Sequence, residues 1–179
     1  MLDVGCGTGH AINLMAREYP QSNFVGYDIA EDAVATARAE ARDVGLSNVR
    51  FQALDVAALP QHPKFDLITA FDAIHDQADP ATVLQKVSQA LASDGTYLMI
   101  DFKFSSNLEE NISNPFAPMY YGISVMHCMT VSLAEGGAGL GTVWGEQTAR
   151  QMLAEAGFTR VEVVDSPRPQ NCIYICHKG

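Results

Sequence analysis

Three glycines at alternate positions, Gly5, Gly7 and Gly9, constrain this chain more than any other feature. An apolar run ends just before them at Val4, and a helical pattern of apolar residues begins just after them at Ala11. Glycine lets the backbone approach a ligand where a Cβ atom would collide. The N-terminus of the following helix presents unpaired N–H groups to polar or anionic atoms. A strand, a glycine turn and a helix in this order predict a site for a nucleotide-like ligand.

The spacing of the glycines separates two kinds of nucleotide site. A dinucleotide fingerprint, G-x-G-x-x-G, would place its third glycine where this chain has His10. The run Leu-Asp-Val-Gly-Cys-Gly-Thr-Gly (residues 2–9) instead resembles motif I of the class I S-adenosylmethionine (SAM)-dependent methyltransferases. The resemblance implies SAM as cofactor, S-adenosylhomocysteine (SAH) as product and a small molecule as methyl acceptor. It also implies that the acid before the loop, Asp3, supports the loop or the ligand amino group. The loop itself would contact the methionine part of the ligand through Gly5, Cys6, Gly7, Thr8 and Gly9.

Acidic residues follow the next two predicted strands, residues 23–27 and 49–54. Asp28 lies 23 positions after Gly5 (28 − 5), near the roughly 20 expected for a ribose-binding acid. We therefore expect Asp28 to accept hydrogen bonds from both ribose hydroxyls, with Ile29 beside it. The alternative is an acid favoured by the dipole of the next helix. The resemblance implies that Asp55 accepts from the adenine amino group and that the N–H of Val56 donates to the ring; the alternative is an ordinary turn aspartate.

Strand and helix patterns alternate along the chain, which predicts an α/β fold with a Rossmann-like, doubly wound, mostly parallel sheet. The predicted helices are residues 10–19, 31–43, 79–95 and 146–156, and the later predicted strands are 65–71, 96–101, 160–164 and 172–177. The resemblance implies seven strands with the last one antiparallel. Ligands bind outside the carboxyl ends of the strands in such sheets. Phe71 and Asp72, at the end of the fourth strand, therefore join the predicted cofactor site.

An insertion at about residues 105–145 interrupts the alternation. We expect it to fold partly as a helix over residues 118–133 and to act as a lid over the site, with the glycine-rich run 136–141 as its hinge. A core or interface helix is the alternative. The predicted substrate contacts are Tyr120, Tyr121, His127, Trp144 and His75. His75 follows a strand, Phe-Asp-Leu-Ile, that resembles motif IV of the family, and we predict it as the catalytic general base, with a packing role as the alternative.

Composition and charge indicate which binding partners and which cellular location to expect. A formal net charge of −10 argues against DNA or RNA, which would need a basic face. The sequence has no apolar run long enough for a membrane span, and we expect its first residues to form a strand and a binding loop rather than a signal peptide. Four irregularly spaced cysteines predict a reducing, cytoplasmic location without disulfides. We expect no metal site, because Cys172 and Cys176 on one strand would lie about 13 Å apart.

Residues 114–147 resemble a group of methyltransferases that carry an N-terminal winged-helix-like domain. Because only four residues precede Gly5, we expect that this chain, a single SAM-binding domain over residues 1–179, lacks its N-terminal part. A homodimer would then form through that missing region. A methyltransferase is the leading interpretation. A catalytically inactive SAM-binding module, such as the sensor half of a regulator, is the second, and a nicotinamide-dependent dehydrogenase is the third.

Overall fold

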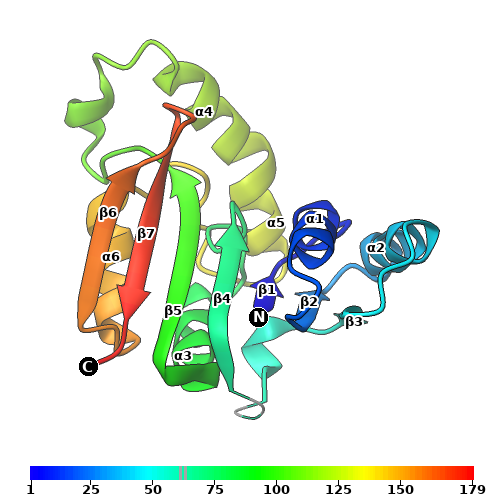
Figure 1. Ribbon diagram of the computed structural model, residues 1–179. Helices are drawn as coiled ribbons and strands as arrows, with labels where there is room; N and C mark the ends of the chain where they lie inside the picture. The colour runs from blue at the N-terminus through cyan, green and yellow to red at the C-terminus, as the bar shows by residue number, and fades with distance from the viewer. Residues whose placement is uncertain (61, 63) are drawn as a thin grey trace.

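The protein folds around one seven-stranded sheet, as the computed structural model of residues 1–60, 62 and 64–179 shows (Figure 1). The strands are β1 (Leu2–Val4), β2 (Phe24–Asp28), β3 (Val49–Ala53), β4 (Phe65–Phe71), β5 (Leu91–Phe102), β6 (Arg160–Asp165) and β7 (Asn171–His177). Their order across the sheet is β3-β2-β1-β4-β5-β7-β6. β1 to β5 are mutually parallel, and β7 runs antiparallel to both of its neighbours. The predicted seven-stranded Rossmann-like sheet with an antiparallel last strand is confirmed.

Helices cover both faces of this sheet. They are α1 (His10–Glu18), α2 (Glu31–Asp43), α3 (Pro80–Ala90) and α6 (Glu146–Glu155). Successive residues of a strand point to opposite faces. Accordingly, Phe24 packs in a core cluster with α1 and α2, while its neighbour Val25 packs in the larger cluster with α3 and α6. The two hydrophobic cores therefore hold the strands in place from opposite sides, and the strand ends are left to form the site.

The third helix ends earlier than the sequence pattern predicts. It stops at Ala90, and β5 begins at Leu91 instead of residue 96. Leu91 is fully buried and follows Val87 at helical spacing, so the periodicity of apolar residues continues although the backbone has become extended. A contact that the local sequence does not reveal lies at this helix end. The ammonium group of Lys178 donates to the carbonyls of Ser88 and Leu91 at 2.9 and 2.6 Å.

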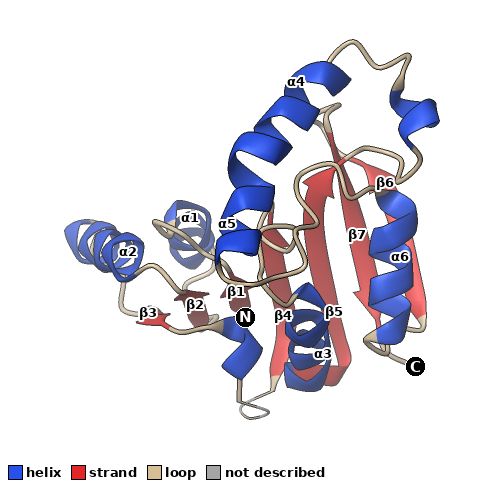
Figure 2. Cartoon of the chain, turned by 180° about the vertical axis from the view of Figure 1, so that it is seen from behind, coloured by secondary structure: helices blue, strands red, loops and turns tan. Residues whose placement is uncertain are grey.

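The segment between β5 and α6 contains one bent helix. A 3₁₀ turn, η2 (Leu108–Asn111), precedes α4 (Ala117–Ile123), a π-helical turn η3 (Ser124–Cys128) and α5 (Met129–Ala134), which follow one another without a break. This agrees with the helix predicted over residues 118–133. The helix lies across the end of the sheet where β4 and β5 finish (Figures 1 and 2).

Candidate functional site

The glycine loop is tied to the end of β2. The N–H groups of Gly5 and Cys6 both donate to the carbonyl of Tyr27, at 2.8 and 3.0 Å. Gly5, Gly7 and Gly9 all have positive φ (68°, 52° and 74°), which side chains rarely adopt. The loop conformation therefore requires glycine at each of these alternate positions.

The three glycines nevertheless face different surroundings. A Cβ atom on Gly5 would lie 2.6 Å from that of Ala73, and one on Gly9 would lie 2.6 Å from that of Ala37. A Cβ atom on Gly7 would meet no atom of the described chain within 4 Å. Gly5 and Gly9 thus allow close packing, whereas Gly7 leaves open space of the kind that a bound ligand needs.

Asp28 fixes the loop from the end of β2. One carboxylate oxygen accepts from the N–H of Gly7 at 2.7 Å, and the other accepts from the N–H of Ala30 at 2.9 Å. A carboxylate oxygen has two lone pairs. Each oxygen of Asp28 therefore retains a lone pair for a ligand hydroxyl, as the ribose prediction requires.

Asp55 occupies the corresponding place after β3. Its carboxylate accepts from the N–H of Ala57 at 2.9 Å and caps the short 3₁₀ turn η1 (Val56–Ala58). Val56 itself is buried in the larger core cluster. Its side chain therefore stabilises the turn that presents Asp55.

A cavity of about 500 Å³ brings the predicted cofactor residues together. It lies among the carboxyl ends of β1 to β4, and its lining includes Gly5, Asp28, Ile29, Asp55, Phe71 and Asp72. Ile29 is 75% exposed, which is unusual for an isoleucine. A bound adenosine would cover this side chain. The bent helix contributes Val131 and Ser132 to the cavity lining, and Glu135, directly after the helix, also lines it.

A larger cavity, of about 700 Å³, lies at the opposite end of the sheet and is lined by Met1, Tyr19, Arg50 and Lys64 among others. Ligands of open parallel sheets bind at the carboxyl ends of the strands. The smaller cavity is the candidate site, because of these two it alone is lined by Gly5 of the glycine loop and by strand-end acids such as Asp28 and Asp55. The other loop residues, Cys6, Gly7, Thr8 and Gly9, are not part of its lining.

Asp3 lies beneath the loop rather than on the cavity wall. It is only 2% exposed, and its carboxyl accepts from the hydroxyl of Thr69 at 2.6 Å. Burial raises the pKa of Asp3 to about 7, the Thr69 hydrogen bond opposes this rise, and the charge of Asp28 adds to it. Asp3 therefore joins β1 to β4 below the loop, which fits the predicted supporting role.

Asp72 follows β4 in a strained conformation. It is a non-glycine residue with positive φ, at 51°, and such residues are frequent at functional sites. Asn171 of β7 donates to its carboxylate at 3.0 Å. Burial, followed by the charge of Asp101, raises the pKa of Asp72 to about 6.

His75 is 2% exposed, behind the cavity wall. Its Nδ1 lies 2.8 Å from a carboxylate oxygen of Asp101 at the end of β5, and its Nε2 lies 3.4 Å from Asp76. Burial lowers the pKa of His75, but the hydrogen bond and charge of Asp101, together with the charges of Asp76 and Asp72, outweigh burial and raise it. The role of His75 as general base stays a prediction.

The predicted substrate residues lie in different surroundings. Tyr120 packs its ring against Phe102 and Phe104, with ring centroids 4.9 and 5.4 Å away. The hydroxyl of Tyr121 accepts from Asn111 at 3.0 Å. His127 is exposed on the bent helix, whereas Trp144 is only 5% exposed within the larger core. Their substrate contacts stay predictions.

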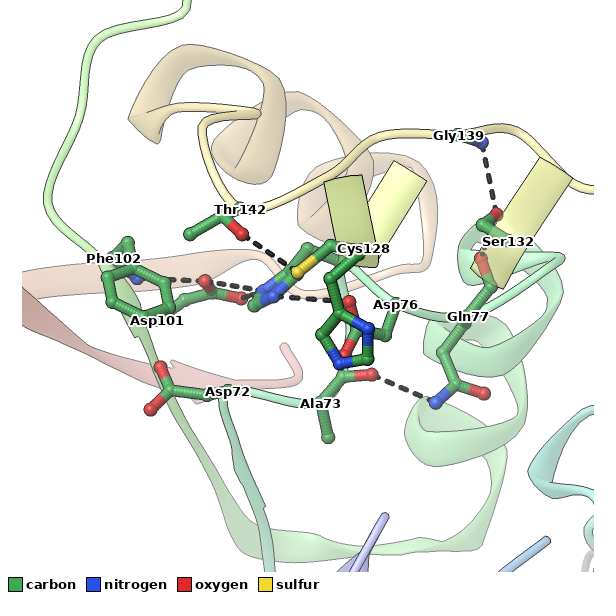
Figure 3. A network of polar contacts seen from close by, with 12 residues as sticks. Asp72, Ala73, Asp76, Gln77, Asp101, Phe102, Cys128, Ser132, Gly139 and Thr142 are labelled. Carbon is green, nitrogen blue, oxygen red and sulfur yellow. Dashed lines mark hydrogen bonds and ion pairs between the residues drawn. The ribbon is translucent and has the colours of Figure 1, made fainter. Parts of the chain in front are cut away.

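The glycine-rich run 136–141, predicted as a hinge, packs on the loop after β4. Ala138 donates its N–H to the carbonyl of Ala78 at 2.9 Å, and a Cβ atom on Gly137 would lie 2.4 Å from the Cα of Ala78. The hydroxyl of Ser132 donates to the carbonyl of Gln77 and accepts from the N–H of Gly139 (Figure 3). These contacts attach the helix to the cavity wall.

Sequence reasoning missed one feature of this region. The side chains of His75, Asp76 and Cys128 converge, with their donor atoms all within 4.8 Å of one another. Between His75 and Cys128 the sequence contains α3, β5, the 3₁₀ turn η2 and α4. No local pattern could therefore have paired them.

Comparison with known proteins identifies the family. A profile of the family described as "Methyltransferase domain" matches residues 1–157. The chain belongs to this family. Its fold and glycine loop thus confirm the resemblance to class I SAM-dependent methyltransferases.

Individual relatives of this methyltransferase domain support the same conclusion. The chain is 34% identical over 102 residues to the uncharacterized methyltransferase YcgJ of Bacillus subtilis, covering 56% of this chain and 40% of YcgJ. Among solved structures, it is similar to PigF with SAH (TM-score 0.74, 18% identity, 99% of this chain and 50% of PigF). It is also similar to a SAM-dependent methyltransferase from Clostridium acetobutylicum (TM-score 0.68, 17% identity, 99% of this chain and 83% of that protein). The chain thus spans half or less of the length of YcgJ and PigF. In the part of the chain that the structure describes, none of the helices of this domain is long and apolar enough to cross a lipid bilayer.

Proposed function

We propose that this domain binds SAM in the cavity of about 500 Å³ and transfers its methyl group to a small-molecule acceptor. The main support for this proposal is that four strand ends meet at one cavity, which is lined by Gly5, Asp28, Asp55 and Asp72. The family match supports the reaction, and the SAH in the PigF structure supports the cofactor. The cavity volume is within the usual range for sites that hold a molecule of this size.

The chain's own groups would orient the cofactor. The free lone pairs of Asp28 would accept the ribose hydroxyls, Asp55 would accept the adenine amino group, and the open space beside Gly7 would hold the methionine part. When bound, SAM supplies a methyl group on a sulfonium centre that an acceptor displaces in line, so the protein mainly aligns the partners. The carboxylates around the cavity suit a ligand that carries this positive charge.

The segment 105–145 would close the cavity from above, as the predicted lid. Val131, Ser132 and Glu135 already line the cavity and support this proposal. We further propose a cytoplasmic location and a small-molecule partner rather than a nucleic acid; the four free cysteines and the net charge of −10 support both.

Turnover tests the proposal directly. The chain is incubated with SAM and a panel of phenols, carboxylic acids, amines and thiols, and SAH release is measured against heat-denatured chain. Acceptor-dependent release of SAH is expected. Tight SAM binding without release with any acceptor class would instead favour a SAM-binding module without catalysis.

A further inference from the structure

The cluster of His75, Asp76 and Cys128 combines three kinds of metal-binding side chain under the bent helix. His75 and Asp76 belong to the loop after β4, and Cys128 belongs to the π-helical turn η3. We propose that these three side chains bind one transition-metal dication, with Zn²⁺ as the preferred ion. The proposal does not depend on methyl transfer, because metal binding is measured without turnover.

The orientation of His75 fits a metal ligand. Its Nδ1 lies 2.8 and 3.1 Å from the two carboxylate oxygens of Asp101, a residue that is itself fully buried and also accepts from the N–H of Phe102. A metal-binding histidine commonly donates its second ring N–H to a carboxylate, which fixes the ring. Asp101 therefore directs Nε2 toward Asp76 and Cys128.

Oδ1 of Asp76 lies 3.4 Å from Nε2 of His75, an ion-pair distance, but makes no hydrogen bond to it. This Oδ1 atom is buried, and it has no hydrogen-bond partner among the residues that the structure describes. Burying a carboxylate oxygen without a partner is costly, and a bound cation would remove that cost. The side chain as a whole is 36% exposed, so it can rotate to complete the geometry.

The separations are close to those of a tetrahedral zinc site. Ligand atoms bonded to Zn²⁺ at 2.0–2.3 Å lie about 3.3–3.5 Å from one another. His75 Nε2 and Asp76 Oδ1 are already 3.4 Å apart, and the Cys128 sulfur lies within 4.8 Å of a ring nitrogen of His75 and of a carboxylate oxygen of Asp76. A shift of about 1 Å at Cys128 would complete three bonds.

The position of Cys128 is set by two features of the fold. The π-helical turn widens the helix at this residue, and such turns are frequent at functional sites. The hydroxyl of Thr142 donates to the Cys128 sulfur at 2.9 Å, which would support a metal-bound thiolate (Figure 3). The thiolate, imidazole and carboxylate set is characteristic of Zn²⁺ and unlike the oxygen sites of Mg²⁺ and Ca²⁺.

A metal here would join the bent helix to the loop after β4. Three protein ligands leave a fourth position open, as in zinc sites that bind a water molecule or a substrate. Asp76 lines the candidate cavity, so that position would lie at the cavity edge. His75 would then act as a ligand through Nε2 rather than as a general base.

Cobalt titration tests the proposal. The chain is freed of metal with a chelator and titrated with Co²⁺ under reducing, anaerobic conditions, and the near-ultraviolet absorbance of the cobalt–thiolate bond is recorded. We expect one equivalent to bind, the band to disappear when Zn²⁺ is added, and the band to be absent in Cys128→Ala. The matched control is Cys176→Ala, which removes a buried thiol on β7 and should leave the band unchanged.

A second variant covers the case in which Cys128→Ala fails to fold. Asp76→Asn changes a partly exposed side chain, and we expect it to weaken Zn²⁺ binding at least 10-fold while circular dichroism of the metal-free protein stays unchanged. Absence of a cobalt–thiolate band in the unmodified chain would overturn the proposal. Zn²⁺ affinity that is the same with and without Asp76→Asn would also overturn it.

Discussion

At the scale of single residues, the acids of the candidate site perform two different tasks. Asp28 and Asp55 each hold backbone N–H groups and also line the cavity. Asp3 is buried below the loop and contacts Thr69 instead. The first two can exchange hydrogen bonds with a ligand, whereas the third can act only through the loop. This difference can be measured.

Replacing Asp28 by alanine should weaken ligand binding far more than it weakens the fold. A hydrogen bond to a charged group contributes about 1.5–3 kcal/mol, so we expect the loss of even one ribose hydrogen bond to lower SAH affinity by at least about 10-fold. Calorimetric titration measures this affinity. Asp43→Ala, the same charge change at the exposed end of α2, is the control. Unchanged affinity in Asp28→Ala would refute the ribose assignment.

Gly7 and Gly45 form a matched pair. Both have positive φ, 52° and 72°, and a Cβ atom on either would meet nothing within 4 Å. Alanine at either position should therefore reduce stability similarly, by roughly 1 kcal/mol of backbone strain. Only Gly7→Ala should also reduce SAH affinity, by more than about 10-fold (1.4 kcal/mol), because its methyl group would occupy the ligand's space. Equal affinities for the two variants would place the ligand elsewhere.

Asp3 should make stability depend on pH. Its pKa is raised from 3.8 in the unfolded chain to about 7, so the folded state holds this proton more tightly. The free energy of unfolding therefore falls as pH rises from about 4 to about 7. Asp3→Asn should reduce the difference between urea unfolding at pH 5 and pH 8 by more than about 1.4 kcal/mol, the equivalent of one pKa unit. An undiminished difference would show that Asp3 does not cause it; Asp43→Asn is the control.

The residues of the candidate cofactor site could be selected from the sequence because each follows directly from a local pattern. The glycine turn precedes its helix, and Asp28 and Asp55 follow their strands. His75 and Asp101 illustrate the opposite case. They meet only because β4 and β5 are neighbours in the sheet, and Cys128 joins them only through the bend of its helix. Such contacts depend on the finished tertiary structure.

At the scale of elements, the end of α3 is hydrogen-bonded by a residue that is distant in sequence. The C-terminal carbonyls of a helix need hydrogen-bond donors. Here the ammonium group of Lys178, which follows β7, donates to the carbonyls of Ser88 and Leu91. The apolar pattern alone predicts a helix that extends further, because Leu91 continues the spacing of Val83, Leu84 and Val87. Sequence periodicity identified the helix and its buried face but not the point where it ends.

Removing this distant donor should destabilise the protein. Lys178→Met leaves two partly buried carbonyl groups without their ammonium donor, and we expect the free energy of unfolding to fall by about 1–2 kcal/mol. Lys103→Met removes an exposed ion pair with Asp165 and should cost less than about 0.5 kcal/mol. Urea denaturation of both variants makes the comparison. A smaller effect for Lys178→Met than for Lys103→Met would contradict this account of the helix end.

At the scale of the whole molecule, the alternation of strands and helices predicted an open, mostly parallel sheet wound on both faces, and the resemblance to the family supplied the seven strands and the antiparallel last strand. The insertion was predictable only as a helix. Its position against the cavity depends on the contacts of Ser132 with Gln77 and of Ala138 with Ala78, which join segments far apart in sequence. The domain thus combines a locally encoded cofactor half with a wall that only the complete fold positions.

The central claim is that the cavity at the carboxyl ends of β1 to β4 is an adenosyl-ligand site. Calorimetric titration of the chain with SAM, SAH and NAD tests it most directly. We predict saturable binding of SAM and SAH, weakened by more than about 10-fold in Gly7→Ala and retained in Gly45→Ala, and no binding of NAD. Binding of NAD in place of the adenosyl ligands, or binding of SAH that Gly7→Ala leaves unchanged, would contradict the claim.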